Sequence, residues 1–209
     1  MPLRAVVFDY GMVLSGPANP AAHQRQLELT RLPHAVFEEN YWRLRLEYDR
    51  GALNGQGFWR ELARNAAIML DQPTIDRLIA QDILLWADLD PEMLRWAAQV
   101  RAAGLRTGIL SNMGEELLAH IKKNFPWIHS FNHCTWSCEL GLVKPDVAIY
   151  QYTLERLGVR AEDALFLDDK IVNVEGARRV GMHAIHYRGL TTLQEDLAQA
   201  GWASQLPVL

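Results

Sequence analysis

The chain has 209 residues, a formal net charge of −4 and 49% hydrophobic residues, enough for one large domain or two small ones. The sequence has no basic run, which argues against a nucleic-acid partner. It also lacks an apolar stretch of about 18 residues, so no membrane span is expected. The N-terminus enters a strand rather than a signal peptide, and only two cysteines favour a reducing compartment. We therefore expect a cytoplasmic protein without nucleic-acid or membrane partners.

The first predicted element is a strand at 5–8, a short apolar run typical of a strand buried on both faces of a parallel sheet. Asp9 follows it directly, and Gly11 stands two residues later. Four amphipathic helices are predicted next, at 21–32, 35–51, 56–70 and 73–86, with no strand between them. A helical block inserted after the first strand indicates a separate small domain.

Helices and strands alternate from residue 88 onward. The next predicted helix has Asp90 as its N-cap and stops at Gly104. Further helices are predicted at 114–124, 144–158 and 173–181, and strands at 105–110, 134–136, 164–169 and 183–187. This alternation predicts an α/β fold, a doubly wound parallel sheet built from residues 1–17 and 88–209, with a four-helix domain inserted at 18–87.

Polar residues stand where three of the predicted strands end. These are Asp9, Ser111–Asn112 and Asp168–Asp169, and Lys144 opens a predicted helix. Ligands bind beyond the carboxyl ends of the strands in an open parallel sheet, so we expect these side chains to converge. An aspartate can attack phosphorus and form an aspartyl-phosphate, and Asp9 with the acidic pair would hold Mg²⁺, which prefers oxygen ligands.

Catalysis at such a site needs positive charge, because a carboxylate repels a phosphate dianion. Lys144 would supply a cation and Ser111 a hydroxyl, while the amides of Asn112 and Met113, at the start of a helix, would bind an anion. A helix cap at 111–112 and a solvated loop lysine are the simpler interpretations of these residues. The adjacent acids at 168–169 are harder to explain otherwise, since unpaired charge at the end of a core strand is costly.

Four stretches together resemble the motifs of the haloacid dehalogenase-like (HAD) hydrolase superfamily: VVFDYGMVL, GILSN, GLVKPD and LFLDDKIVN. The resemblance covers all of the strand–helix part and implies its Rossmann-like core. The insert at 18–87 resembles the four-helix C1 cap of the family. LGLVKPDVAIYQ and DDKIVNVEGA are particularly similar to small sugar-phosphate phosphatases of the glucose-1-phosphate phosphatase kind and to the N-terminal domain of soluble epoxide hydrolase.

The resemblance implies a Mg²⁺-dependent phosphatase that cleaves a small phosphomonoester, with a sugar phosphate as the favoured class. It makes Asp9 the nucleophile and a metal ligand, together with the main-chain carbonyl of Gly11. Asp169 would be a direct ligand, and Asp168 either a ligand or an acid that holds a metal-bound water. The partner would be a small phosphorylated metabolite, and the protein a monomer or a dimer.

The same resemblance assigns the phosphate-binding groups. Ser111 and Asn112 would bind the phosphate, and Lys144 would contact both the phosphate and the nucleophile. Asn173 occupies a position where the family often has a supporting acid or amide.

Gly11 departs from the family pattern, because most family phosphatases carry a second aspartate there that acts as general acid and then as base. The glycine carbonyl can still bind the metal, but the proton relay is missing. General acid–base catalysis typically contributes about 10²- to 10⁴-fold in rate. Turnover is therefore slow, or another group replaces the aspartate, and Glu47, Asp49 and Glu115 are the candidates.

Three alternatives stay open. Haloacid dehalogenation uses an aspartate nucleophile without Mg²⁺, but its enzymes tend to have a small polar residue in place of the pair Asp168–Asp169. A phosphomutase would need the acid that Gly11 lacks. A module that binds phosphate and metal with weak turnover or none is the non-enzymatic alternative.

Substrate choice is expected to lie with the insert. A cluster on or near one of its helices could line a cleft, although a solvated helix face is the simpler interpretation: Arg43, Arg45, Tyr48, Asp49 and Arg50. The tryptophans of the insert are predicted to pack rather than to stack on a ligand: Trp42, Trp59 and Trp86.

The segment HSFNHCTWSC raises the possibility of a metal site formed by Cys134, Cys138, His129 and His133. Closely spaced ligand pairs are missing, and residues four apart on a strand lie about 13 Å apart. Buried or half-buried thiols are therefore predicted instead.

Overall fold

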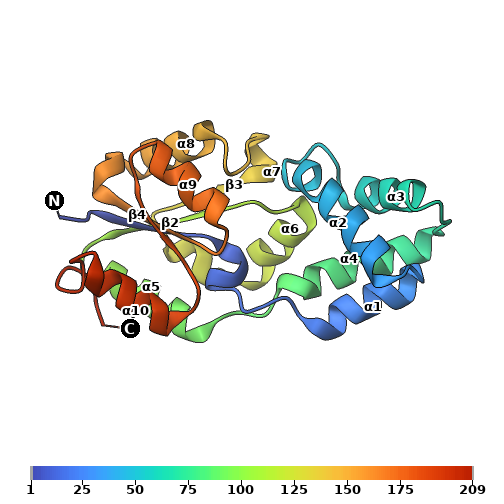
Figure 1. The fold of residues 1–209 in the computed structure, drawn as a ribbon, viewed down its shortest axis with the longest axis horizontal. Coiled ribbons are helices and arrows are strands. Elements are labelled where there is room, and N and C mark those ends of the chain that lie inside the picture. The colour runs from blue at the N-terminus through green and yellow to red at the C-terminus, as the bar shows by residue number, and fades with distance from the viewer. Residues whose placement is uncertain (1, 209) are drawn as a thin grey trace.

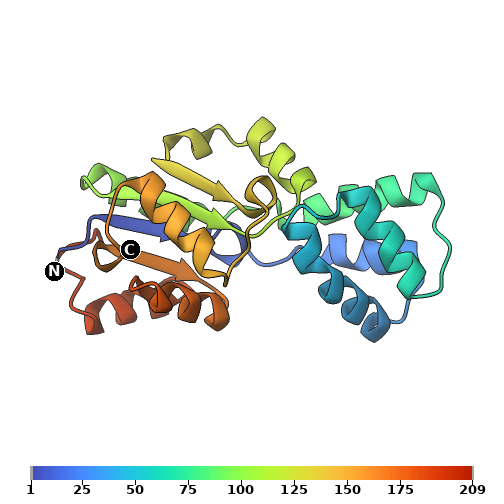
Figure 2. The same ribbon diagram turned by 90° about the horizontal axis from the view of Figure 1, so that it is seen from above.

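The computed structural model describes residues 2–208. Its centre is a parallel five-stranded sheet in the order β3-β2-β1-β4-β5 (Figures 1 and 2). The strands are β1 (Ala5–Phe8), β2 (Arg106–Ser111), β3 (His133–Trp136), β4 (Ala164–Asp168) and β5 (His183–His186). The first strand lies in the middle, paired with β2 on one side and β4 on the other. The sheet confirms the predicted α/β fold.

Helices cover both faces of the sheet, as the continuous apolar strands predict. Figure 1 shows α8 (Val147–Leu157) and α9 (Ile171–Arg179) on one side and α5 (Pro91–Ala102) and α10 (Leu190–Gln199) on the other. The side chains of β1 alternate between the faces, so that Val6 and Phe8 join one hydrophobic cluster while Ala5 and Val7 join the other. All four are completely buried.

The helical insert, residues 18–87, lies to one side of the sheet and opposite the two chain ends (Figures 1 and 2). It contains α1 (Pro20–Thr30), α2 (His34–Asp49), α3 (Gly55–Asn65) and α4 (Gln72–Trp86). These four helices have their own core, which is rich in aromatic side chains such as Phe37, Phe58 and Trp59. The two chain segments that lead into and out of the insert run together, where the amide of Asn19 donates to the carbonyl of Leu85 at 2.9 Å.

Shorter elements complete the chain. They are the irregular turn η1 (Tyr10–Leu14), α6 (Glu115–Asn124), the 3₁₀ turns η2 (Pro126–Ser130) and η3 (Ala161–Asp163), and α7 (Ser137–Leu140). Among residues 2–208, none of the helices combines the length and the apolar character that crossing a membrane requires.

Two predicted helix boundaries differ from the structure by three residues or more. Helix α8 begins at Val147 rather than at Lys144, because hydrogen bonds hold Lys144 in the preceding loop: its amide donates to Asn112 Oδ1 at 2.8 Å and its carbonyl accepts from Asn112 Nδ2 at 3.0 Å. Helix α3 ends at Asn65 rather than near residue 70, and the chain turns at Ala67, which has a φ of 53°.

The insert contacts the core at the beginning of α6. The ring of Tyr48 lies so close to Gly114 that a Cβ atom there would overlap it. The Tyr48 hydroxyl donates to Glu116 Oε2 at 2.7 Å, and the Glu116 carboxylate also accepts the amide of Gly55. These contacts hold the end of α2 against the edge of the sheet where β2 ends.

Candidate active site

Three carboxylates meet where β1 and β4 end. Asp9 follows β1, Asp168 is the last residue of β4, and Asp169 comes next. Because Phe8 pairs with Leu167 in the parallel register, Asp9 and Asp168 leave neighbouring strands side by side. One oxygen of each of the three carboxylates lies within 4.8 Å of those of the other two. The structure therefore brings together the acids that the sequence placed at separate strand ends.

Lys144 lies between two of these acids. Its Nζ is 2.9 Å from Asp9 Oδ1 and 2.6 Å from Asp168 Oδ2, and its side chain is 1% exposed. The reciprocal hydrogen bonds with Asn112 described above fix its main chain. The ammonium also lies 5.4 Å from the centre of the Phe166 ring. Lys144 is thus a buried cation held in place at the carboxylate cluster.

Both carboxylate oxygens of Asp168 already have hydrogen-bond or ion-pair partners, which leaves Asp168 less free to bind a metal. Its Oδ1 accepts the amide of Lys170 at 2.8 Å, and Asn173 Nδ2 lies 3.0 and 3.1 Å from its two oxygens. Asp9 Oδ2 and the Asp169 carboxylate, in contrast, have no side-chain partner among residues 2–208. A cation would therefore find Asp9 and Asp169 available, with Asp168 positioning Lys144 and the loop.

The electrostatics of the cluster are unfavourable without a cation. Burial raises the pKa of Asp9 to about 7, and the charges of Asp168 and Asp169 add to this while Lys144 opposes it. The pKa of Asp169 is also raised, by burial and by the charge of Asp168. Burial alone would lower the pKa of Lys144, but the charges of Asp168 and Asp9 outweigh it and raise that pKa. Three acids facing one ammonium leave an excess of negative charge.

This donor set fits Mg²⁺. The cluster offers only carboxylate oxygens, the hard ligands that Mg²⁺ prefers, and it contains no sulfur or imidazole donor within residues 2–208. Half-buried Asp169 leaves one side open to solvent, so that water could complete an octahedron.

Gly11 leaves open the space that the second aspartate of the family would fill. Its backbone has a φ of −63° and a ψ of 132°, which any residue can adopt. A Cβ at this position would meet no atom within 4 Å. The fold therefore leaves room for an acidic side chain at position 11, and the acid is missing only because the residue there is glycine.

The predicted phosphate-binding groups are only partly placed for that role. Ser111 ends β2 and is 2% exposed. The side-chain amide of Asn112 is already engaged with the main chain of Lys144. The amide of Met113 donates to Ser137 Oγ at 2.9 Å, so the expectation that it faces an anion is wrong, because the β3–α7 corner takes up this donor. Helix α6 begins at Glu115 rather than at the predicted residue 114.

The three candidate replacements for the missing acid lie in different environments. Glu47 and Glu115 are exposed to solvent. Asp49 is 7% exposed at the end of α2, and its carbonyl accepts a hydrogen bond from Ser137 of the core. Burial raises the pKa of Asp49, partly offset by the charge of Arg45. Asp49 is thus the candidate that combines a buried carboxyl of raised pKa with a main-chain contact to the core.

The charged cluster of the insert is not a solvated helix face. Arg45, Tyr48 and Asp49 are buried. Arg45 Nε donates to Asp49 Oδ1 at 2.8 Å, and its Nη1 lies 3.2 Å from both oxygens of buried Asp82. The simpler interpretation is wrong for these three because α4 supplies an acid that the sequence pattern of α2 does not reveal. The remaining two stay in contact with solvent: Arg43 is exposed and Arg50 is half-buried.

One tryptophan of the insert departs from its predicted packing, whereas both cysteines lie as predicted. Trp59 is packed as predicted, but Trp42 is 46% exposed and its ring lies 5.4 Å from Lys170 Nζ. The thiols are free and half-buried, as predicted, and burial raises the pKa of Cys134 to about 12 and that of Cys138 to about 11.

Sequence reasoning missed Glu116 and Lys170. Lys170 directly follows the acidic pair, and this adjacency was a signal that could have identified it. Nothing in the sequence marks Glu116, because its partners Tyr48 and Gly55 are more than 60 positions away.

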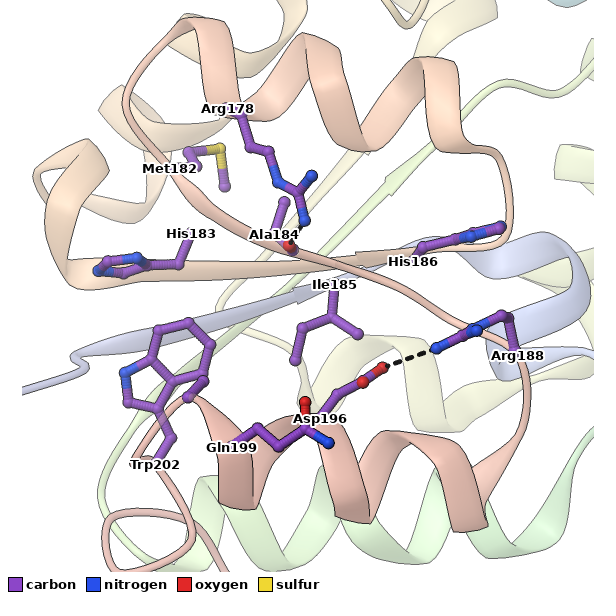
Figure 3. Close-up of a pocket in the computed structure, with 11 residues that line it drawn as sticks. Arg178, Met182, His183, Ala184, Ile185, His186, Arg188, Asp196, Gln199 and Trp202 are labelled. Carbon is purple, nitrogen blue, oxygen red and sulfur yellow. Dashed lines mark hydrogen bonds and ion pairs between the residues drawn. The ribbon is translucent and has the colours of Figure 1, made fainter.

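A cavity of about 700 Å³ is the subject of Figure 3. It borders the edge strand β5 and α10, with His183, His186 and Trp202 in its lining and an ion pair of 3.5 Å between Arg188 and Asp196. None of the three acids of the cluster lines it.

Comparison with known proteins places this geometry in a family. Residues 12–181 match the haloacid dehalogenase-like hydrolase family. The chain is similar to phosphatase MT3486 of Mycobacterium tuberculosis, with 30% identity over 88% of this chain and 87% of that protein. It is 26% identical to (S)-2-haloacid dehalogenase 1 of Pseudomonas sp., over 93% and 88% of the two chains.

A solved structure has the same fold. The HAD family enzyme bt-2542 of Bacteroides thetaiotaomicron, in complex with magnesium and inorganic phosphate, superposes with a TM-score of 0.71 at 19% identity, over 89% of this chain and 94% of that one. The motifs, the sheet topology and the family match all agree. The chain belongs to the haloacid dehalogenase-like hydrolase family.

Proposed function

We propose that this protein is a Mg²⁺-dependent phosphatase that hydrolyses a small phosphomonoester, with sugar phosphates as the first class to test. The observation that carries the proposal is the cluster of Asp9, Asp168 and Asp169 around a single buried lysine. Two similarities support it: one relative is named a phosphatase, and the bt-2542 enzyme was crystallised with magnesium and phosphate.

Asp9 would attack phosphorus and break its bond to the leaving oxygen, forming an aspartyl-phosphate, and the departing alkoxide would take a proton from water. A second water would then attack the phosphorus of this acyl phosphate, releasing inorganic phosphate and regenerating Asp9. The amide of Tyr10 and Lys144 Nζ bind Asp9 Oδ1, at 2.7 and 2.9 Å, and so orient the nucleophile. Lys144 and the hydroxyl of Ser111 would stabilise charge on the transferring group. Bound Mg²⁺, held by Asp9, Asp169 and the carbonyl of Gly11, would neutralise part of the charge on the nucleophile and the phosphate.

We also propose that residues 18–87 are a cap domain over a core formed by residues 1–17 and 88–209. The contacts of Tyr48 and Gly55 with Glu116 support a cap that closes against the core. Closure would exclude water from the carboxylates during transfer. Exposed Trp42, whose ring lies 5.4 Å from Lys170 Nζ, would contact the leaving group.

Phosphate and halide release should be measured in parallel. We expect phosphate release from an aryl phosphate and from members of a sugar-phosphate panel in Mg²⁺, none with chelator, and no halide release from 2-chloropropionate. Metal-independent halide release would show a dehalogenase instead. Mg²⁺-dependent binding of phosphate without turnover would show a binding module.

Restoring the missing acid should accelerate the reaction. We expect Gly11→Asp to raise kcat by about 10²-fold, because a carboxylic acid can protonate the leaving group and the position has room for a side chain. Gly11→Asn is the matched control, with the same shape but no titratable proton. Steady-state kinetics of the three proteins on the aryl phosphate would test this, and equal rates for Asp and Asn would contradict it.

The stability of the metal-free protein should fall as pH rises toward neutrality. Folded Asp9 keeps its proton up to about pH 7, while the unfolded chain releases it near the ordinary value of 3.8. The folded state thus binds more protons in this window, and the free energy of unfolding decreases with pH. Because Mg²⁺ binds the ionised form, it should raise Tm more at about pH 8 than at about pH 5.

Thermal melts with chelator and with excess Mg²⁺ at both pH values would measure this. The Asp9→Asn protein should show a weaker pH dependence of the magnesium effect. An equal gain in Tm at both pH values in the wild-type protein would contradict the assignment.

A further inference from the structure

A second group of metal-ligand side chains lies in the insert, between α1 and α2. His23 comes from α1, and His34 and Glu38 stand four residues apart on α2, a spacing that places them on one face of the helix. One donor atom from each lies within 4.8 Å of the other two. His23 Nε2 is 2.7 Å from Glu38 Oε1, and the two imidazole rings are 5.5 Å apart.

A cavity of about 300 Å³ adjoins these three residues, and its lining includes a polar side chain without a partner. Gln26 is completely buried, and neither its Nε2 nor its Oε1 forms a hydrogen bond within residues 2–208. Gln26 follows His23 by three positions, on the same face of α1. The indole of Trp86, from α4, also lines this cavity. Leaving both polar atoms of the Gln26 amide unpaired is costly, so they indicate a polar occupant.

We propose that His23, His34 and Glu38 bind a Zn²⁺ ion, which is distinct from the proposed Mg²⁺ of the active site. Two imidazoles and one carboxylate form a donor set that suits zinc and not Mg²⁺. In a tetrahedron with zinc bonds of about 2.0–2.1 Å, the ligand atoms lie about 3.4 Å apart. The three donor atoms already lie within 4.8 Å of one another, so small side-chain rotations would bring them to that distance. A water in the fourth position would have the amide of Gln26 as a hydrogen-bond partner in the cavity.

The surroundings of Glu38 also fit a metal ligand. Its Oε2 accepts the indole N–H of Trp42 at 2.8 Å, while Oε1 points to His23. Zinc would replace the His23–Glu38 hydrogen bond and leave the Trp42 bond in place, and hydrogen-bonded carboxylates of this kind are common at metal sites. The ion would tie α1 to α2 and thereby stabilise the insert.

The test is a zinc titration against a chromophoric chelator, with untagged protein carrying Asp169→Asn to weaken the acidic cluster and with excess Mg²⁺. We expect one Zn²⁺ per chain and a rise in Tm. His34→Ala should weaken zinc binding by about 100-fold or more. Removing a direct ligand should lower the metal affinity at least as much as removing a side chain that only hydrogen-bonds to a ligand. His34 is exposed, so this variant should fold. Glu38→Gln keeps the shape of the side chain and should weaken binding as well.

His129→Ala is the matched control, because it removes an exposed histidine of the core. It should leave zinc affinity unchanged. Substitution with Co²⁺ adds a second readout, since tetrahedral Co²⁺ absorbs visible light more strongly than octahedral Co²⁺, and this absorption should disappear in the His34→Ala protein. The proposal is overturned if no zinc binds, or if His34→Ala and His129→Ala bind it equally well.

Discussion

The Asp9→Asn protein is expected to lose phosphatase turnover by about 10⁴-fold or more, because an amide cannot form the aspartyl-phosphate. The substitution keeps the shape of the side chain and leaves the 2.6 Å pair between Lys144 and Asp168 in place. It also removes a buried carboxyl whose pKa is raised, so Tm should not fall. The loss of activity should therefore occur in a folded protein.

Steady-state phosphate release, together with thermal melts of both proteins, would measure this effect. Asp76→Asn is the matched control, an exposed acid of the insert that is changed in the same way. It should retain wild-type activity. Substantial Mg²⁺-dependent turnover by the Asp9→Asn protein would contradict the proposed nucleophile.

Replacing Lys144 should damage stability and activity together. In the Lys144→Met protein, the carboxylates of Asp9 and Asp168 lose their shared cation, and removing one partner of a buried ion pair typically costs about 3–5 kcal/mol. Loss of this charge near the transferring phosphate should lower kcat by about 10²- to 10³-fold. Because Lys144 holds the pKa of Asp9 down, the acidic limb of the pH–rate profile should move to higher pH.

Denaturant unfolding and pH-dependent kinetics would check both effects. Lys123→Met is the matched control, because it makes the same substitution at an exposed lysine of α6. Excess Mg²⁺ should restore part of the lost stability of the Lys144→Met protein, because it too neutralises the acids. A Tm equal to that of the Lys123→Met protein would contradict this account of the cluster.

The sequence determined the sheet and its acidic edge because the signals are local. Continuous apolar runs define buried strands, and an acid directly after such a run lies at the carboxyl edge of a parallel sheet. Asp9 and Asp168–Asp169 could therefore be placed from the sequence. Only the register of β1 and β4 brings them into contact.

The position of Lys144 relative to these acids was decided by the tertiary structure. The sequence predicted it at the start of a helix, but its loop is held by Asn112, a residue 32 positions earlier. The same reason explains the errors at Met113 and Arg45. The partners Ser137 and Asp82 come from other elements, and no local pattern in the sequence encodes such pairings.

The acids, the glycine at position 11 and the helical insert follow from the sequence alone, because each depends on residue type and on nearest neighbours along the chain. The salt bridges of Lys144, the docking of Tyr48 on Glu116 and the meeting of His23 with Glu38 follow only from the packed chain. Distances between side chains from different elements depend on how those elements pack, and packing is a property of the whole fold.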